Sequence, residues 1–216
     1  MVELTGQESY LGELYSRNPP DSLARLAGKT VAIAGAGGLG SNIAVSLLRA
    51  GVQRLIIADF DRVELSNLNR QYYFSDQVGH LKVEALAENL LRINPYAELV
   101  VHPVEITSGN LVALLGGADI LVEAFDGAAA KAMAVRAWLG SFPDRYVITG
   151  SGLAGFGQSA SLVTTVRGRL VICGDQQGNR IEELGLSATR LGIVAQLQAN
   201  AALEILLSGT MTGYPG

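Results

Sequence analysis

A glycine-rich run, Gly35-Ala36-Gly37-Gly38-Leu39-Gly40, follows a short apolar segment and precedes a stretch with helical spacing. Glycines at such a place allow a tight turn and let a phosphate approach backbone N–H groups at the positive end of a helix. Asp59 follows the next apolar segment, where a carboxylate accepts hydrogen bonds from ribose hydroxyls. These features predict a nucleotide site but do not separate ATP from NAD. The structural alternative is a turn that packs a helix on a strand, with Asp59 as a cap.

An unusual polar stretch follows Asp59, where a dinucleotide dehydrogenase would normally begin its next helix. It carries Asn67, Arg70 and Gln71 near the predicted carboxyl end of a strand, where ligands bind in sheets of this kind. Lys82 comes near the start of a predicted helix, where a cation is disfavoured unless a bound polyphosphate offsets it. The spacing therefore favours a triphosphate site. The alternative is that Arg70 and Lys82 are a solvated surface pair.

Alternating strands and helices must position these residues. Apolar runs predict strands at 31–34, 55–58, 99–104, 120–124 and 146–148, and helical spacing predicts helices at 41–50, 83–93, 111–115, 128–139 and 187–207. Ser187 is the expected N-cap of the last helix. Segments 159–166 and 170–173 are expected to pair as an antiparallel hairpin. We therefore predict an α/β fold, with a Rossmann-like, mostly parallel sheet, helices on both faces and the hairpin at one edge.

The chain of 216 residues is long enough for one full domain with additions. Two short helical stretches flank Asn18-Pro19-Pro20, where the prolines should break any helix. We expect an N-terminal helical extension over 1–28, the main domain over 29–208 and a C-terminal tail over 209–216.

Composition excludes several classes of protein. A net charge of −4 argues against a broad nucleic-acid footprint, and no amphipathic basic stretch or run of about 18 apolar residues favours a membrane. The single cysteine, Cys173, excludes an internal disulfide and a zinc site built of cysteines, and it fits a reducing compartment. The N-terminal residues lack the pattern of a signal peptide, so we expect a cytoplasmic protein.

Taken together, the motifs resemble the ThiF/MoeB/HesA superfamily, which is similar to ubiquitin-activating enzymes. The matching motifs are Gly-x-Gly-Gly-x-Gly, Asp-x-Asp-x-Val-x-x-Ser-Asn-Leu-x-Arg-Gln, Gly-x-x-Lys and Arg92-Ile93-Asn94-Pro95. The short length, together with Glu123-Ala124-Phe125-Asp126, Gly150-Ser151-Gly152 and Val171-Ile172-Cys173-Gly174-Asp175, looks most like the short ThiF branch, which is linked to the sulfur carrier of thiamine synthesis. The resemblance covers roughly residues 29–208.

The resemblance implies roles for individual residues. Gly38 and Asp59 would hold adenosine, the stretch from Ser66 to Gln71 and Lys82 would hold the triphosphate, and Asp126 would be a catalytic acid that positions Mg²⁺. An acid ahead of a helix can also be a simple cap. The implied cofactor-binding set is Gly35, Gly37, Gly38, Gly40, Asp59, Asp61, Ser66, Asn67, Arg70, Gln71 and Lys82, and the implied catalytic set is Asp126, Arg70 and Lys82. The family usually has Asn where this chain has Gly127, so a side-chain contact is lost there.

The implied activity is ATP-dependent adenylation of the C-terminal glycine of a small ubiquitin-like sulfur carrier ending in Gly-Gly, with release of pyrophosphate, in thiamine biosynthesis. The resemblance also implies a homodimer, with an arginine from the partner's N-terminal region on the phosphates; Arg17 and Arg25 are the candidates. Alternatives are a NAD-dependent oxidoreductase, a non-catalytic nucleotide-binding scaffold, and a relative that adenylates a small molecule or a tRNA carboxylate.

Four departures and open points concern the later part of the chain. Relatives with structural zinc use two Cys-x-x-Cys pairs, so a zinc site is not expected here. Cys173 would be a buried strand-end residue or, alternatively, a thiol that accepts the activated carrier. The glycines at 150, 152, 155 and 157 would line a path for the carrier's tail or mark a bend in a strand. In relatives a crossover loop at this place covers the carrier's tail, and the polar loop 174–186 is expected to be mobile.

Overall fold

A computed structural model describes residues 6–178 and 180–213 of the chain. The strands are β1 (Thr30–Ala34), β2 (Arg54–Ala58), β3 (Glu98–His102), β4 (Ile120–Glu123), β5 (Val147–Gly150), β6 (Val163–Arg167) and β7 (Leu170–Gly174). The α-helices are α1 (Gly6–Leu14), α2 (Ser22–Leu26), α3 (Gly38–Arg49), α4 (Lys82–Leu91), α5 (Leu111–Leu115), α6 (Ala128–Ser141), α7 (Ile181–Leu184) and α8 (Ala188–Ser208). Short 3-10 turns occur at η1 (Leu65–Asn67), η2 (Ser75–Gln77) and η3 (Ser159–Ser161).

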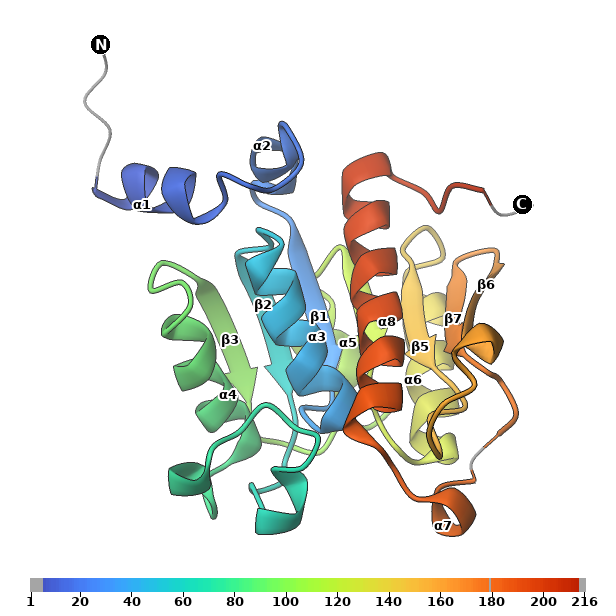
Figure 1. The fold of residues 1–216 in the computed structure, drawn as a ribbon. Helices are drawn as coiled ribbons and strands as arrows, with labels where there is room; N and C mark the ends of the chain where they lie inside the picture. The colour runs from blue at the N-terminus through green and yellow to red at the C-terminus, as the bar shows by residue number, and fades with distance from the viewer. Residues whose placement is uncertain (1–5, 179, 214–216) are drawn as a thin grey trace.

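The strands form one seven-stranded sheet in the order β3-β2-β1-β4-β5-β7-β6. All neighbours are parallel except β6 and β7, which pair antiparallel from Val163 opposite Gly174 to Arg167 opposite Leu170. Helices α3, α4 and α8 cover one face, and α5 and α6 cover the other (Figure 1). The prediction of a Rossmann-like, mostly parallel sheet with an antiparallel hairpin at one edge is confirmed.

Helix α8 runs through the middle of one layer and packs against α3. The Ser187 hydroxyl caps it by accepting the N–H of Arg190 at 3.2 Å, as predicted. It is long and apolar enough to cross a membrane by length and composition. Because Leu191, Val194 and Ala202 are buried in the core of this domain, its apolar face is accounted for by packing.

The structure differs from the predicted elements around the hairpin. The expected strand 159–166 begins only at Val163, because Gln158 takes a left-handed conformation (φ 49°) and opens the turn η3. Helix α7 lies within the segment 174–186 that the sequence predicts to be a loop. Such local turns depend on contacts that a hydrophobic pattern does not record.

The two N-terminal helices pack on the amino-terminal side of the sheet, at the end opposite to the one where strands β1, β2 and β4 finish (Figure 1). Tyr15 is buried there; its hydroxyl donates to the Leu48 carbonyl at 2.9 Å and accepts from Asn94 at 3.2 Å. The Arg25 guanidinium donates to the Leu207 carbonyl at the end of α8. Within this extension Leu11, Tyr15 and Leu26 are buried, and Leu26 packs in the main core.

Candidate functional site

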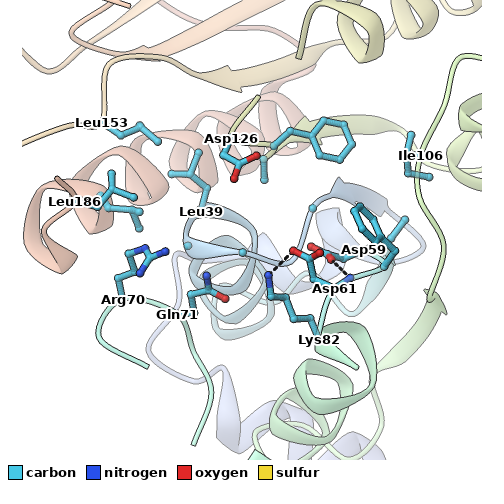
Figure 2. Close-up of a pocket in the computed structure, with 18 of the residues that line it drawn as sticks. Leu39, Asp59, Asp61, Arg70, Gln71, Lys82, Ile106, Asp126, Leu153 and Leu186 are labelled. Carbon is cyan, nitrogen blue, oxygen red and sulfur yellow. Dashed lines mark hydrogen bonds and ion pairs between the residues drawn. The ribbon is translucent and has the colours of Figure 1, made fainter. Parts of the chain in front are cut away.

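A pocket of about 320 Å³ opens where β1, β2 and β4 end, which is where ligands bind in open α/β sheets. Figure 2 shows cationic, acidic and apolar side chains converging on it from several elements. Its polar and glycine lining is Gly35, Gly37, Gly38, Asp59, Asp61, Arg70, Gln71, Lys82 and Asp126. Nine of the residues predicted from sequence therefore meet in one place, although they come from four separate stretches of the chain.

The glycines of the loop have two structural roles, which are close backbone packing and an open backbone that faces the pocket. Gly35 has φ 102°, and a Cβ there would lie 2.9 Å from the Ala124 carbonyl oxygen, so a side chain is excluded. A Cβ on Gly40 would overlap the carbonyl oxygen of Gly35, because the first turn of α3 sits directly on the loop. Gly37 faces the pocket, and a Cβ there would meet only the Gln71 side chain at 3.9 Å. Gly40 thus packs the helix, while Gly37 keeps backbone open to a ligand.

Asp59 fixes the loop from the end of β2. Its carboxylate accepts the N–H of Ala36 at 2.6 Å and the N–H of Asp61 at 2.8 Å. Burial raises the pKa of Asp59, and these two hydrogen bonds oppose the rise. Tyr73, which the sequence analysis missed, donates its hydroxyl to the Ala36 carbonyl at 2.6 Å. The N–H and the carbonyl of Ala36 are therefore both hydrogen-bonded, the N–H to Asp59 and the carbonyl to Tyr73. Asp59 thus stabilises the loop in addition to being a candidate ribose ligand.

Two cations face the pocket in different states. Lys82 is nearly buried, and its Nζ lies 2.7 Å from a carboxylate oxygen of Asp61. Asp61 therefore supplies the negative charge that offsets a lysine at the first turn of α4. Arg70 donates to the Ser66 carbonyl at 3.0 Å and to the Asn69 side chain at 2.8 Å, and within the described residues it has no carboxylate partner. The positive charge of Arg70 is thus available to an anion.

Gln71 adds an unused acceptor to the same wall. The residue is 9% exposed, lines the pocket, and its Oε1 atom has no hydrogen-bond partner within the described parts of the chain. A buried amide oxygen without a donor costs free energy, so the site is suited to a ligand that donates a hydrogen bond to it.

The structure does not bring every predicted residue to the pocket. Ser66 is exposed, and Asn67 is buried and accepts the N–H of Glu64 at 3.1 Å, so both shape the turn η1. Gly40 lies behind the loop, as its packing on Gly35 requires. Contact of Ser66 or Asn67 with a phosphate is left as a prediction.

Asp126 faces these groups from the end of β4 (Figure 2). It is exposed, and the N-cap of α6 is Gly127, so the carboxylate is not engaged in capping that helix. No group of three or more metal-ligating side chains occurs in the described ranges, and Asp126 is a lone carboxylate. A lone carboxylate suits Mg²⁺, which is commonly held by one or two carboxylates and substrate phosphates.

Apolar side chains complete the pocket opposite the phosphate loop. They are Phe60, Val104, Ile106, Phe125, Leu153, Leu186 and Leu191. Short-range sequence patterns could not have assembled this set, because its members lie on loops and helices that are distant along the chain. A flat aromatic base is the kind of group that such a surface buries.

Two further hollows lie beside the pocket, and each hollow shares lining residues with the next one. Asp126, Leu153 and Ile181 also line a chamber of about 130 Å³, and Gly152 and Gly178 join that chamber to a cavity of about 340 Å³ beneath α7. Gly152, Gly155 and Gly157 all have positive φ. These glycines follow the end of β5 and shape a bent loop, whereas one predicted alternative was a bend within a strand, and residues of this loop line the hollows.

Three predicted candidates lie outside these hollows. Cys173 is fully buried, and burial raises the pKa of its thiol to about 11, as expected for a strand-end core residue. Arg25 belongs to α2 and Arg17 to the segment between α1 and α2, and Figure 1 shows these helices at the amino-terminal side of the sheet. Neither arginine can reach the pocket of its own chain.

The fold and the pocket define a Rossmann-like nucleotide-binding domain. The ThiF family model matches residues 13–215, and the chain belongs to the ThiF family. The match includes α2 and the last two residues of α1, and it extends beyond the end of α8 at Ser208.

Two curated relatives show how far the sequence similarity extends. Ubiquitin-like modifier-activating enzyme 5 of Caenorhabditis elegans is 44% identical over 84 residues, which are 39% of this chain and 20% of that protein. The sulfur carrier protein adenylyltransferase of Thermus thermophilus is 35% identical over 130 residues, which are 60% of this chain and 43% of that protein. The matched segments thus span less than half the length of these relatives.

Solved structures support the fold. The Escherichia coli tRNA N6-threonylcarbamoyladenosine dehydratase TcdA, solved in complex with ATP, superposes with a TM-score of 0.83 at 19% identity, covering 97% of this chain and 98% of that one. Escherichia coli MccB with ATP gives a TM-score of 0.71 at 21% identity, covering 97% and 65%.

Proposed function

We propose that this protein is an ATP-dependent adenylyltransferase that activates the C-terminal glycine carboxylate of a small ubiquitin-like sulfur carrier. The observation that carries the proposal is that two hollows lie side by side: Arg70, Gln71 and Lys82 line the nucleotide pocket, Asp126 lines both hollows, and three glycines are among the residues that line the neighbouring chamber. A polyphosphate and a thin, extended chain end could meet at Asp126.

The chemistry fits the residues that are present. A terminal carboxylate has a pKa near 3.3–3.7, so it is ionised at neutral pH and needs no general base. Its oxygen would attack the α-phosphorus of ATP, the bond from that phosphorus to the oxygen bridging to the β-phosphate would break, and pyrophosphate would leave with that oxygen. The main barrier is the approach of two anions, which Arg70 and Lys82 would lower by neutralising phosphate charge.

Mg²⁺ is a proposal that the donor set fits. Asp126 would hold the ion together with phosphate oxygens, and Mg²⁺ would supply further neutralisation of the developing pyrophosphate. The position of Asp126 between the phosphate pocket and the glycine-walled chamber is the geometric support for this role.

The nature of the carrier is inferred from relatives and from shape. The relatives described above include a sulfur carrier protein adenylyltransferase and an enzyme that activates a ubiquitin-like modifier. Glycine walls admit a chain end without side chains, such as Gly-Gly. A place in thiamine biosynthesis, a homodimer in which Arg17 or Arg25 serves the partner's site, and a cytoplasmic location are parts of the same proposal.

A second candidate is adenylation of a carboxylate on tRNA or on a small molecule. TcdA is described as a tRNA-modifying enzyme, and its chain matches this one almost from end to end. The net charge of −4 disfavours tRNA, because binding to a phosphate backbone needs clustered cations. A NAD-dependent oxidoreductase has lost its support, since the chain belongs to the ThiF family.

Carrier-dependent exchange of label between pyrophosphate and ATP tests the proposal. Asp126→Ala and Arg70→Ala should each slow exchange at least about 100-fold, as loss of one transition-state contact commonly does, while both proteins stay folded. Asp144→Ala and Arg167→Ala are matched controls, because both side chains are exposed and lie outside the pocket. The proposal is wrong if no Gly-Gly-ended carrier supports exchange by the wild type, or if both pocket variants exchange normally.

A further inference from the structure

The small chamber beside the nucleotide pocket contains a cation of its own. At about 130 Å³ it is smaller than the nucleotide pocket of about 320 Å³. Its lining within the described residues is Asp126, Ala128, Lys131, Gly150, Ser151, Gly152, Leu153, Gly178 and Ile181. Lys131 is the one basic side chain in that lining and Asp126 is the one acidic side chain, so an anion that enters the chamber has a single cationic partner, Lys131, beside one carboxylate.

Lys131 is held in place by a buried carboxylate. Its Nζ lies 3.2 Å from each of the two carboxylate oxygens of Glu123, whose side chain is completely buried at the end of β4. The Lys131 side chain is 20% exposed. An ammonium group has three N–H donors, and a pairing with two oxygens of one carboxylate leaves donor capacity toward the chamber.

Glu123 is itself fixed by the sheet. Its carboxylate accepts the N–H of Phe125 at 2.6 Å and the hydroxyl of Thr149 on the neighbouring strand β5. The Glu123 carbonyl accepts the side-chain amide of Gln198 from α8 at 3.1 Å. These hydrogen bonds fix the Glu123 carboxylate, and the carboxylate in turn fixes the position of the Lys131 ammonium group.

The buried ion pair of Glu123 and Lys131 is not expected to add much to the free energy of unfolding. Removing two charges from water usually cancels their attraction, and apolar residues of the same size are often as stable or more stable. The pair stands where a ligand cavity begins, and its cationic member faces that cavity. A use in ligand binding explains both the burial of Glu123 and the partial exposure of Lys131.

We infer that Lys131, oriented by Glu123, binds the carboxylate of the molecule that is adenylated. This inference rests on the proposed function and adds to it a carboxylate subsite separate from the cations of the triphosphate. Arg70 and Lys82 line the nucleotide pocket but not the chamber. The protein would then use Arg70 and Lys82 for ATP and Lys131 for the acceptor. It would also bind an ionised chain end more tightly than an amidated one.

The decisive comparison uses a synthetic peptide, acetyl-Leu-Gly-Gly, as the free acid and as the C-terminal amide. Calorimetry in the presence of a non-hydrolysable ATP analogue should show that the wild type prefers the acid by about 10- to 100-fold, the range of one hydrogen bond to a charged group. Lys131→Met should abolish the preference, and Lys131→Arg should restore at least part of it. The inference is overturned if the wild type shows no preference or if Lys131→Met keeps it.

A double variant separates binding from folding. Lys131→Met alone leaves the buried Glu123 charge unpaired, so Glu123→Gln/Lys131→Met, which removes both charges, is the matched protein. It should fold, bind the ATP analogue within about threefold of the wild type, and show no preference for the acid. Retention of the preference by this folded double variant also overturns the inference.

Pyrophosphate exchange distinguishes failure of the inference from failure of the proposed function. With a carrier that supports exchange by the wild type, the double variant should raise KM for the carrier at least about tenfold and change KM for ATP less than threefold. An unchanged KM for the carrier refutes the role of Lys131 and leaves the adenylation proposal standing. No exchange by the wild type with any Gly-Gly-ended carrier refutes the adenylation proposal and, with it, this inference.

Discussion

Adding one methyl group at either of two glycines in the phosphate loop should separate folding from nucleotide binding. The two positions are Gly37 and Gly40, three residues apart. At Gly40 the new Cβ would overlap the backbone carbonyl of Gly35, which no side-chain rotation can relieve. At Gly37 the nearest atom to a Cβ is a flexible amide nitrogen of Gln71 at 3.9 Å, and φ is negative at −77°, so a methyl group meets no backbone atom there.

The magnitudes follow from these contacts. Overpacking against groups that cannot move costs about 1–3 kcal/mol or more, and alanine regains about 1 kcal/mol of helix propensity relative to glycine. Because the contact at Gly40 is an overlap with backbone, we expect Gly40→Ala to lose about 2 kcal/mol or more in free energy of unfolding. For a chain of this size that lowers Tm by about 4–8 °C. Gly37→Ala should change Tm by less than about 2 °C.

Gly37→Ala, which should hardly change stability, should weaken ATP binding. A methyl group there occupies the face through which a phosphate would approach the loop, so we expect Kd for ATP to rise at least about tenfold. Thermal unfolding by circular dichroism and ATP titration by calorimetry measure the two effects on the same samples. If Gly37→Ala binds ATP as the wild type does, phosphates do not lie on this loop. If Gly40→Ala keeps the wild-type Tm, the packing argument is wrong.

Three further predictions concern other parts of the molecule. Lys82→Met should raise KM for ATP at least about tenfold in the exchange assay and cost only about 1 kcal/mol in unfolding, because its partner Asp61 is about half exposed; a wild-type KM would contradict a phosphate role. Cys173 should resist Ellman's reagent at pH 7–8 in the native protein and react once denaturant is added, because a pKa of about 11 leaves little thiolate below that pH; rapid native labelling would refute its burial. Tyr15→Phe should lower Tm by about 2–4 °C, the cost of about one hydrogen bond, with ATP affinity unchanged, and a weaker affinity for ATP would show that this end of the sheet communicates with the pocket.

Much of the fold is readable from the sequence because its signals are local. Strand β1 and the loop after it are an apolar run followed by glycines, and the capping role of Ser187 needs only the residues that follow it. The hairpin at the sheet edge could be predicted from two neighbouring apolar segments with Arg167-Gly168 near the turn, although the start of β6 could not.

The site was harder to predict where it depends on distant pairs. The sequence argument assigned the charge near the start of α4 to a ligand, whereas Lys82 already pairs with Asp61, 21 residues away. Tyr73 was missed because the hydroxyl of a tyrosine in a loop gives no sign that it will reach Ala36. Lys131 and Glu123 were missed because helical spacing describes α6 equally well with a solvated lysine.

Helix α8 spans the distance between the nucleotide pocket and the end of the molecule that carries the N-terminal helices. Leu191 near its start lines the nucleotide pocket, and Leu207 near its end takes the hydrogen bond from Arg25. At 1.5 Å per residue these two points are about 24 Å apart. An arginine of the N-terminal helices that touched a nucleotide would therefore touch the one bound by a neighbouring molecule, and turnover per molecule would then fall on dilution.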